Sequence, residues 1–140
     1  MLDFKYNIEL PSIEYIHLKK NYYLLIFNDE LSVIIDSETK YFNATYTCKH
    51  MNKNINNWLK SEYIMELIDM YDCDNIDEIN SNRGSYYPVK ITGKPIKHNS
   101  IIRGIYIYKY LFLELLKWIS NDLYNKYSII IYDYDYFYNF

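Results

Sequence analysis

The spacing of apolar residues changes along this chain, and the changes restrict it to folds that combine strands with helices. Residues 22–26 and 31–35 are short aromatic or β-branched runs, and Asn28-Asp29-Glu30 between them is a turn signal. This pattern predicts a β-hairpin. Apolar residues at 55–71 instead recur every three or four positions, which is typical of a helix with one buried stripe.

Further along the chain the same two patterns alternate. The other elements are expected at these positions: a strand at 40–42, a helix at 43–51 capped by Asn43, strands at 86–91 and 101–108, a helix at 111–119, and a last helix from Ser120 or Asn121 to Tyr134. For residues 129–140 a strand is the competing interpretation. We expect these strands and helices to form an α+β fold.

Length and composition allow one domain, which we expect to span residues 1–140. Half of the residues are hydrophobic, enough for a packed core in which we place both Trp58 and Trp118. No apolar run is long enough to span a bilayer, and no secretory leader is evident at the first residues. We therefore expect an intracellular protein without membrane contact.

Enzyme and metal signatures are missing from the sequence. None of the patterns GxSxG, GxxxxGK[ST], GxGxxG and HExxH occurs, so we predict no catalytic residues and no cofactor. Cys48, His50, Cys73 and His98 do not have the spacing of a structural zinc site. The acidic stretch 72–75 lacks the glycine of a calcium loop. We predict no metal site.

Charge is divided into blocks. Residues 39–60 contain four lysines and no acidic residue, and residues 83–109 contain six basic residues and no acidic one. Residues 61–82 contain seven acidic residues and no basic one, although the whole chain carries a net charge of −3. The two basic blocks can meet on one face of the fold, or each can be a solvated surface without a partner.

The start of the expected helix at 55–71 is the first candidate nucleic-acid surface. Its lysines can neutralise phosphates and its asparagine amides can pair with an adenine edge. Its residues are Lys49, Lys53, Asn54, Asn56, Asn57 and Lys60. Basic residues first and acidic residues last oppose the helix dipole, which hints at a role other than stability, while a polar helix cap is the alternative.

The expected hairpin at 86–108 is the second candidate surface. A basic tip with few apolar side chains suits a wing lying along a nucleic-acid backbone, whereas lysines on a sheet edge can also simply discourage aggregation. Its residues are Lys90, Thr92, Lys94, Lys97, His98 and Arg103. Gly104 is expected to permit an unusual backbone conformation before the following strand.

Five motifs occur here in the order found in the KilA-N domain of large DNA viruses and phages. Tyr41-Phe42-Asn43-Ala44-Thr45 resembles the Y-[IF]-N-A-T signature, and Asn57-Trp58-Leu59-Lys60 resembles N-W-L-[KR]. Glu66-Leu67-Ile68 follows at the position of a downstream turn. Arg103 to Ile107 resembles R-G-x-Y-[IV], and Trp118-Ile119-Ser120 resembles W-[IL]-S. The resemblance covers residues 23–134.

The resemblance implies a winged-helix-type module related to the fungal APSES DNA-binding domains. It implies an N-terminal β-hairpin, a helical pair, a wing-like β-hairpin and C-terminal helices, with residues 54–71 and 86–108 forming the binding surface. The family's RING finger, present in some poxvirus relatives, is not part of this chain. Tyr108-Lys109 stands where the family usually has His-Pro.

These observations predict a non-enzymatic viral protein that binds double-stranded DNA with weak sequence specificity, in the host cytoplasm rather than the nucleus. The alternative is a module that binds a host or viral protein through the acidic block 61–82 or the aromatic C-terminal tail. The acidic total charge and the missing His-Pro favour the alternative. Self-association through the tail, residues 132–140, is a third possibility.

Overall fold

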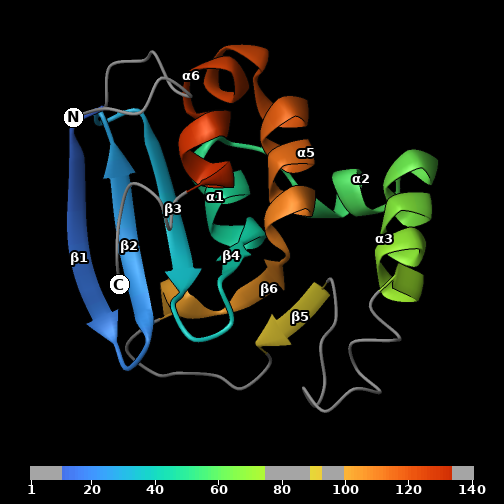
Figure 1. Ribbon diagram of the computed structural model, residues 1–140, viewed down its shortest axis with the longest axis horizontal. Helices are drawn as coiled ribbons and strands as arrows, with labels where there is room; N and C mark the ends of the chain where they lie inside the picture. Colours follow the sequence, from blue (N-terminus) through green and yellow to red (C-terminus); the bar gives the residue numbers. More distant parts are fainter. Residues whose placement is uncertain (1–10, 75–88, 93–99, 134–140) are drawn as a thin grey trace.

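A single antiparallel sheet is the framework of the protein. The computed structural model describes residues 11–74, 89–92 and 100–133 (Figure 1). The six strands lie in the order β1-β2-β3-β4-β6-β5, and all neighbouring pairs are antiparallel. The strands are β1 (Ile13–Lys19), β2 (Tyr22–Phe27), β3 (Leu31–Asp36), β4 (Tyr41–Asn43), β5 (Val89–Thr92) and β6 (Gly104–Ile107).

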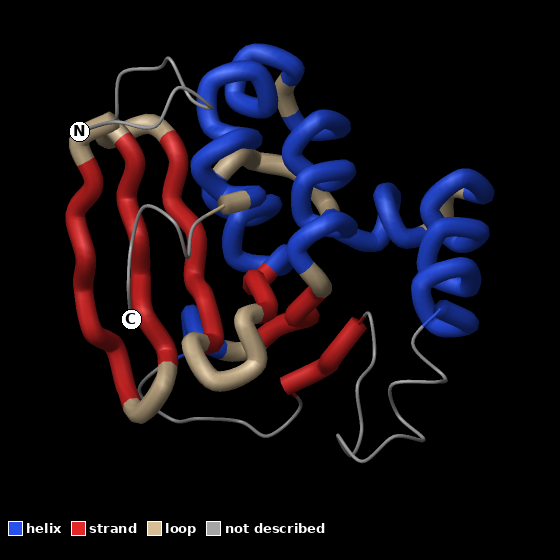
Figure 2. The backbone as a smooth tube through the Cα atoms, in the orientation of Figure 1, coloured by secondary structure: helices blue, strands red, loops and turns tan. Residues whose placement is uncertain are grey.

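Helices cover one face of this sheet and extend to one side of it (Figures 1 and 2). The helices are α1 (Ala44–His50), α2 (Ile55–Leu59), α3 (Glu62–Asp74), α5 (Lys109–Ile119) and α6 (Asn121–Tyr132), with a 3₁₀ turn at Ser100–Ile102. Helices α1, α5 and α6 pack on the sheet, whereas α2 and α3 stand beside this body. The expected α+β fold is confirmed.

The main core lies between the sheet and the three helices. Phe42 of β4 stacks on Phe112 of α5 with ring centroids 4.7 Å apart, and Phe27 of β2 contacts Tyr127 of α6. A smaller cluster, which includes Ile34, Tyr41 and Tyr106, fills the opposite face of the sheet. Strand β3 is therefore buried along its whole length.

The expected N-terminal hairpin is confirmed as β2 and β3. Asn28 and Asp29 take positive φ angles of 51° and 57°, which asparagine and aspartate tolerate better than most residues. The side chain of Asn28 also accepts a hydrogen bond of 2.8 Å from the Ser12 backbone N–H. This contact joins the turn to β1, a strand that the sequence pattern did not indicate.

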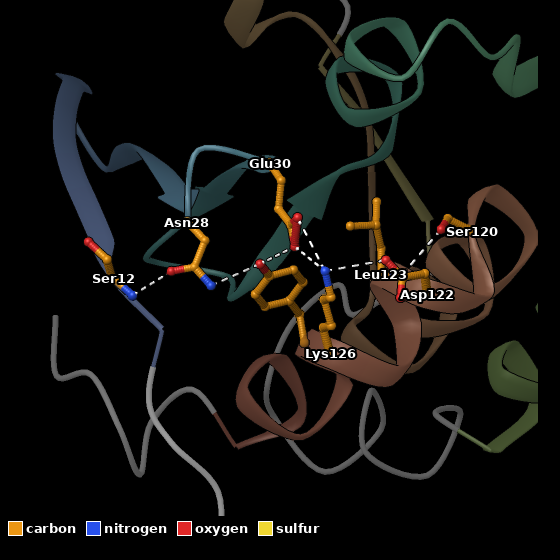
Figure 3. Close-up of polar contacts among 8 residues, drawn as sticks. Ser12, Asn28, Glu30, Ser120, Asp122, Leu123 and Lys126 are labelled. Carbon is orange, nitrogen blue, oxygen red and sulfur yellow. Dashed lines mark hydrogen bonds and ion pairs between the residues drawn. The ribbon is translucent and has the colours of Figure 1, made fainter.

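A polar network ties the same turn to helix α6 (Figure 3). The Glu30 carboxylate accepts hydrogen bonds from the Tyr127 hydroxyl at 2.5 Å and from Lys126 Nζ at 3.1 Å. Asn28 Nδ2 donates to the Tyr127 oxygen at 3.1 Å. The hydrogen bond from Tyr127, followed by that from Lys126, holds the pKa of Glu30 below its ordinary value. The network thus favours the ionised carboxylate.

The expected long helix at 55–71 is wrong, because the chain forms two helices that meet at Lys60-Ser61. The Ser61 hydroxyl accepts a hydrogen bond of 3.2 Å from the Ile64 N–H, as the N-cap residue just before a helix does. Lys60 is the C-cap of α2, and Glu62 lies in the first turn of α3. Lys60 and Glu62 therefore suit the helix dipoles, so the basic residues are not misplaced, whereas the acidic end of α3, with no basic residue in its last turn, still opposes the dipole of that helix.

Two further expectations need correction. The expected strand at 101–108 begins only at Gly104, after the 3₁₀ turn. Trp118 is not a core residue, because 41% of it is exposed, whereas Trp58 is 1% exposed. The expected last helix is confirmed to Tyr132, where Ser120 caps it by accepting the Leu123 N–H.

Some expectations concern residues that the structure does not describe. The hairpin tip with Lys94, Lys97 and His98, most of the acidic stretch after α3, and the tail from residue 134 lie outside the described residues. Within the described part, no helix is both long and apolar enough to cross a lipid bilayer.

Candidate nucleic-acid interface

The candidate interface is built on Asn43, the last residue of β4. Asn43 is completely buried, and its side-chain oxygen caps α1 by accepting the Tyr46 N–H at 2.9 Å. Its amide nitrogen donates to the carbonyl oxygens of Ile101 and Ile102, both at 3.2 Å, and of Arg103 at 3.4 Å. One side chain therefore fixes both the start of α1 and the segment that precedes β6.

A second set of contacts joins the same two segments. The Thr45 hydroxyl oxygen accepts the Ile105 N–H at 2.9 Å. Gly104 has a φ of +150°, and a Cβ atom there would lie 2.7 Å from both Asn43 Oδ1 and Thr45 Cβ. Only glycine fits this close approach with this backbone conformation. The expectation of an unusual conformation at Gly104 is confirmed.

These contacts place two cations at one hollow. Lys49, on the last turn of α1, and Arg103 line a depression of about 110 Å³ together with Thr45, Tyr46 and Ile101. Both cationic residues are exposed to solvent. Two exposed cations at a shared hollow attract an anion such as a phosphate.

Lys53 extends this group beyond the end of α1. Its backbone N–H donates to the Cys48 carbonyl oxygen at 2.7 Å, so the chain turns back before α2 begins. Its side-chain nitrogen lies 5.6 Å from the centroid of the Trp118 ring, a cation–π contact. Lys49, Lys53 and Arg103 together form what we call the basic surface.

Helix α2 presents the asparagines of the first candidate set. Asn54 is the N-cap, and its side-chain oxygen accepts the Asn56 N–H at 2.9 Å. Ile55 and Trp58 are buried, while Asn56 and Asn57 are exposed between them. Asn54 therefore has a structural role, and the two exposed amides remain available to a ligand.

Lys60 does not share the surroundings of the other lysines. It is exposed at the C-cap of α2, and the acidic helix α3 begins two residues later. Glu62, Glu66 and Asp69 of that helix are exposed. Lys60 therefore stands in the chain directly before an acidic helix and not among the other lysines.

The second candidate set lies only partly within the described residues. Lys90 and Thr92 belong to β5, where they are paired with Tyr106 and Gly104 of β6. Strands β5 and β6 form one edge of the main sheet. Lys94, Lys97 and His98 lie outside the described residues, so the wing stays a prediction.

The sequence matches the KilA-N domain family over residues 26–136. This chain belongs to the KilA-N domain family. The family is generally associated with DNA binding and is not a known enzyme family. That residues 1–140 form one domain stays a prediction. The roles of the individual site residues in binding nucleic acid also stay predictions.

Relatives of this chain include proteins of an iridescent virus and of fowlpox virus. The chain is 30% identical over 125 residues to KilA-N domain-containing protein 313L of Invertebrate iridescent virus 6, covering 89% of this chain and 34% of that protein. Protein 006L of the same virus is 30% identical over 127 residues, with the same two shares of coverage. An uncharacterized fowlpox virus protein, FPV248, is 27% identical over 103 residues, covering 74% of this chain and 64% of that protein.

These relatives support a viral origin for the chain. The chain spans about a third of the length of the iridescent virus proteins and less than two thirds of the fowlpox virus protein. No solved structure matches it.

The KilA-N motifs explain how the basic surface is assembled. The Y-F-N-A-T segment supplies Asn43 and Thr45, and the R-G-x-Y segment supplies Arg103 and Gly104. These two motifs, about 60 residues apart in sequence, bind one another directly. Their role in this structure is to hold α1 and the start of β6 together.

Sequence reasoning missed Trp118 as a surface residue. Its spacing from Leu111 and Leu115 indicates a buried stripe, and both of those leucines are indeed buried. Trp118, however, lies in the last turn of α5 and is partly exposed. The spacing gives the face of a helix but not how far its neighbours cover that face.

Cys48 offers no activated thiol, and the described residues hold no metal cluster. Cys48 is buried, and desolvation raises the pKa of its thiol to about 11. Within the described residues, no group of three or more His, Cys, Asp and Glu side chains lies close enough to hold a metal ion.

Proposed function

We propose that this KilA-N domain binds double-stranded DNA with weak sequence specificity through the basic surface. The observation that carries this proposal is the fixed placement of Lys49 and Arg103 at one hollow, with Lys53 on the next turn of the chain. Three cations on adjoining segments suit consecutive phosphates of a backbone better than a single small anion.

Phosphate contacts account for most of the binding in this proposal. Each lysine or arginine that neutralises a phosphate releases counterions, so the affinity falls steeply as salt is added. The exposed amides of Asn56 and Asn57 are suited to base edges, because an amide can both donate to and accept from adenine. Two such side chains give only modest discrimination between sequences.

The test compares two double variants with the same change of charge. Lys49→Gln/Lys53→Gln removes two charges from the basic surface, and Lys19→Gln/Lys20→Gln removes two exposed charges at the turn between β1 and β2. The first variant should weaken duplex binding and reduce the log–log salt slope by about 2, whereas the control should stay close to the wild type. Equal losses in both variants would contradict the proposal.

A second candidate function is protein binding by α3. Tyr63 and Met65 of this helix are 58% and 54% exposed, beside the carboxylates of Glu62, Glu66 and Asp69. Exposed aromatic and methionine side chains flanked by acids suit a partner with a basic and apolar surface. A partner that binds the wild type but not Tyr63→Ala/Met65→Ala, while DNA binding is unchanged in that variant, would establish this function.

Two related proposals rest on less of the structure. Self-association through the aromatic tail involves residues outside the described part, apart from Tyr132, which is exposed. Sedimentation of the full chain and of a chain ending at Asp133 tests it. A location in the host cytoplasm also stays a prediction, tested by fluorescence microscopy of the tagged protein.

A further inference from the structure

Trp118 is an exposed aromatic ring beside the basic surface. It is one of two tryptophans in the chain, and 41% of it is exposed. A tryptophan ring carries more apolar area than almost any other side chain, so an exposed ring lacks part of the stabilisation that full burial would give the fold. The ring therefore has surface available for a ligand.

Its surroundings are cationic. Lys53 Nζ lies 5.6 Å from the ring centroid, and Lys117, the preceding residue, is exposed with its ammonium 5.4 Å from the Tyr124 ring. Of the nearest carboxylates in sequence, Asp122 pairs with Lys126, whereas Glu114 accepts a hydrogen bond of 3.5 Å from the neutral Tyr63 hydroxyl and keeps its negative charge. The ring thus adjoins cations that an anionic ligand can use.

We propose that Trp118 stacks on an unpaired nucleobase while Lys53 contacts the phosphate of the same nucleotide. An exposed ring next to a cation is the pair of groups by which proteins bind single-stranded nucleic acid. The bases of an intact duplex are already stacked, so the ring can reach one only in a single strand or after a base leaves the helix. The ligand class is therefore single-stranded or locally unpaired nucleic acid.

This inference rests on the proposed function, because Lys53 belongs to the basic surface. It adds a contact that duplex phosphates do not provide. A ligand with unpaired bases should use Lys49, Lys53 and Trp118 together, whereas an intact duplex should use only the cations. The two ligands should consequently respond differently to the loss of the ring.

The experiment uses the full chain, a 12-nucleotide oligothymidine and a duplex of the same length. Trp118→Leu should weaken binding of the single strand by roughly 10-fold, and Trp118→Tyr should keep most of it, because a tyrosine ring still stacks. Duplex binding should change less than about twofold in both variants. Thermal unfolding of each variant checks that the fold is intact.

Tryptophan fluorescence gives a second readout. Trp58 is buried, so quenching by an added oligonucleotide reports Trp118. The single strand should quench the wild type, and Trp118→Tyr should lose this signal although it still binds in anisotropy. Trp58→Phe removes the other tryptophan and isolates the Trp118 signal. If this variant unfolds, the comparison of wild type with Trp118→Tyr supplies the same information.

The outcomes separate this inference from the proposed function. If the wild type binds the duplex and Trp118→Leu binds the single strand as tightly as the wild type does, the inference is overturned and the proposed function stands. Binding and quenching by the single strand without any duplex binding supports the inference and overturns double-stranded DNA as the ligand. Absence of binding to either oligonucleotide overturns both.

Discussion

Two regions of this domain place polar and charged side chains in opposite ways. The junction, which we define as β4, α1 and residues 101–107, holds its chain segments by hydrogen bonds that the Asn43 amide donates and the Thr45 hydroxyl oxygen accepts. The arm, which we define as α2 and α3, stands beside the body and exposes Tyr63 and Met65. The junction carries Lys49 and Arg103 of the basic surface, whereas α3 is acidic.

The junction is the region in which side-chain hydrogen bonds hold the backbone in place. The carbonyl oxygens of Ile101 and Arg103 accept hydrogen bonds from the buried Asn43 amide, so the backbone at Arg103 is held beside the hollow that Lys49 also lines. The arm keeps its place through the packing of Ile55, Trp58 and Ile64 in the core and a hydrogen bond from the Tyr63 hydroxyl to Glu114, while one face of α3 stays exposed. The junction suits the regularly spaced phosphates of a nucleic-acid backbone. The exposed amphipathic helix α3 suits a protein partner that can adapt to it.

The largest expected effect is that of Gly104→Ala in the junction. The new Cβ atom would collide with Asn43 and Thr45, and the φ of +150° is unfavourable for alanine. We expect a loss of roughly 3 kcal/mol or more in the free energy of unfolding, measured by urea denaturation. A loss below 1 kcal/mol would show that the two KilA-N motifs are not held as tightly as described.

A matched pair of asparagine caps tests the comparison directly. Asn43→Ala removes the cap of α1 and the side-chain donor to the carbonyl oxygens of Ile101 and Arg103, while the Tyr106 hydroxyl still donates to that of Ile102, so we expect a loss of about 2–4 kcal/mol. Asn54→Ala removes only the exposed cap of α2, with an expected loss of about 0.5–1 kcal/mol. Equal losses in the two variants, measured in the same urea series, would remove the distinction between junction and arm.

The Glu30 network predicts how stability depends on pH outside both regions. The pKa of Glu30 is lowered in the folded protein, so its contribution is present above the pKa of the unfolded chain and is lost as the pH falls through the folded value. Unfolding free energies measured between pH 6 and pH 3 should therefore fall more steeply for the wild type than for Glu30→Gln. Glu66→Gln, which lies in the arm outside this network, is the control. Parallel curves for wild type and Glu30→Gln would contradict the assignment.

The smallest effect is expected on the arm. Met65 is 54% exposed on α3, so Met65→Ser should change the free energy of unfolding by less than about 0.5 kcal/mol. Thermal and urea unfolding of this variant and of Ile64→Ala, its buried neighbour, give the comparison. A large loss for Met65→Ser would mean that α3 packs more tightly than its exposure indicates.

Much of the fold could be predicted from apolar spacing. The hairpin of β2 and β3, the cap at Asn43, and helices α1, α5 and α6 all have clear periodic patterns. Strand β1 has no such pattern because it is an edge strand with mostly exposed or half-buried side chains. The break between α2 and α3 carried a local signal, Ser61-Glu62, that the overall helical spacing concealed.

The candidate site could be predicted less completely. Lysines 49 and 53 are identified by their charge block, but their approach to Arg103 and Trp118 depends on contacts between distant segments. Asn54 looks like a ligand contact in sequence and is a helix cap in the structure. Trp118 looks like core because helical spacing does not show where the covering elements end.

The central claim is that the basic surface binds a DNA backbone, and a salt series of duplex binding tests it most directly. Fluorescence anisotropy of a labelled duplex, titrated with the wild type from about 50 mM salt upward, gives the log–log slope of affinity against salt. Three phosphate contacts from the basic surface, with further contacts from the predicted wing, give an expected slope of about −3 to −6. The absence of duplex binding at about 50 mM salt, where electrostatic affinity is near its greatest, would contradict the account.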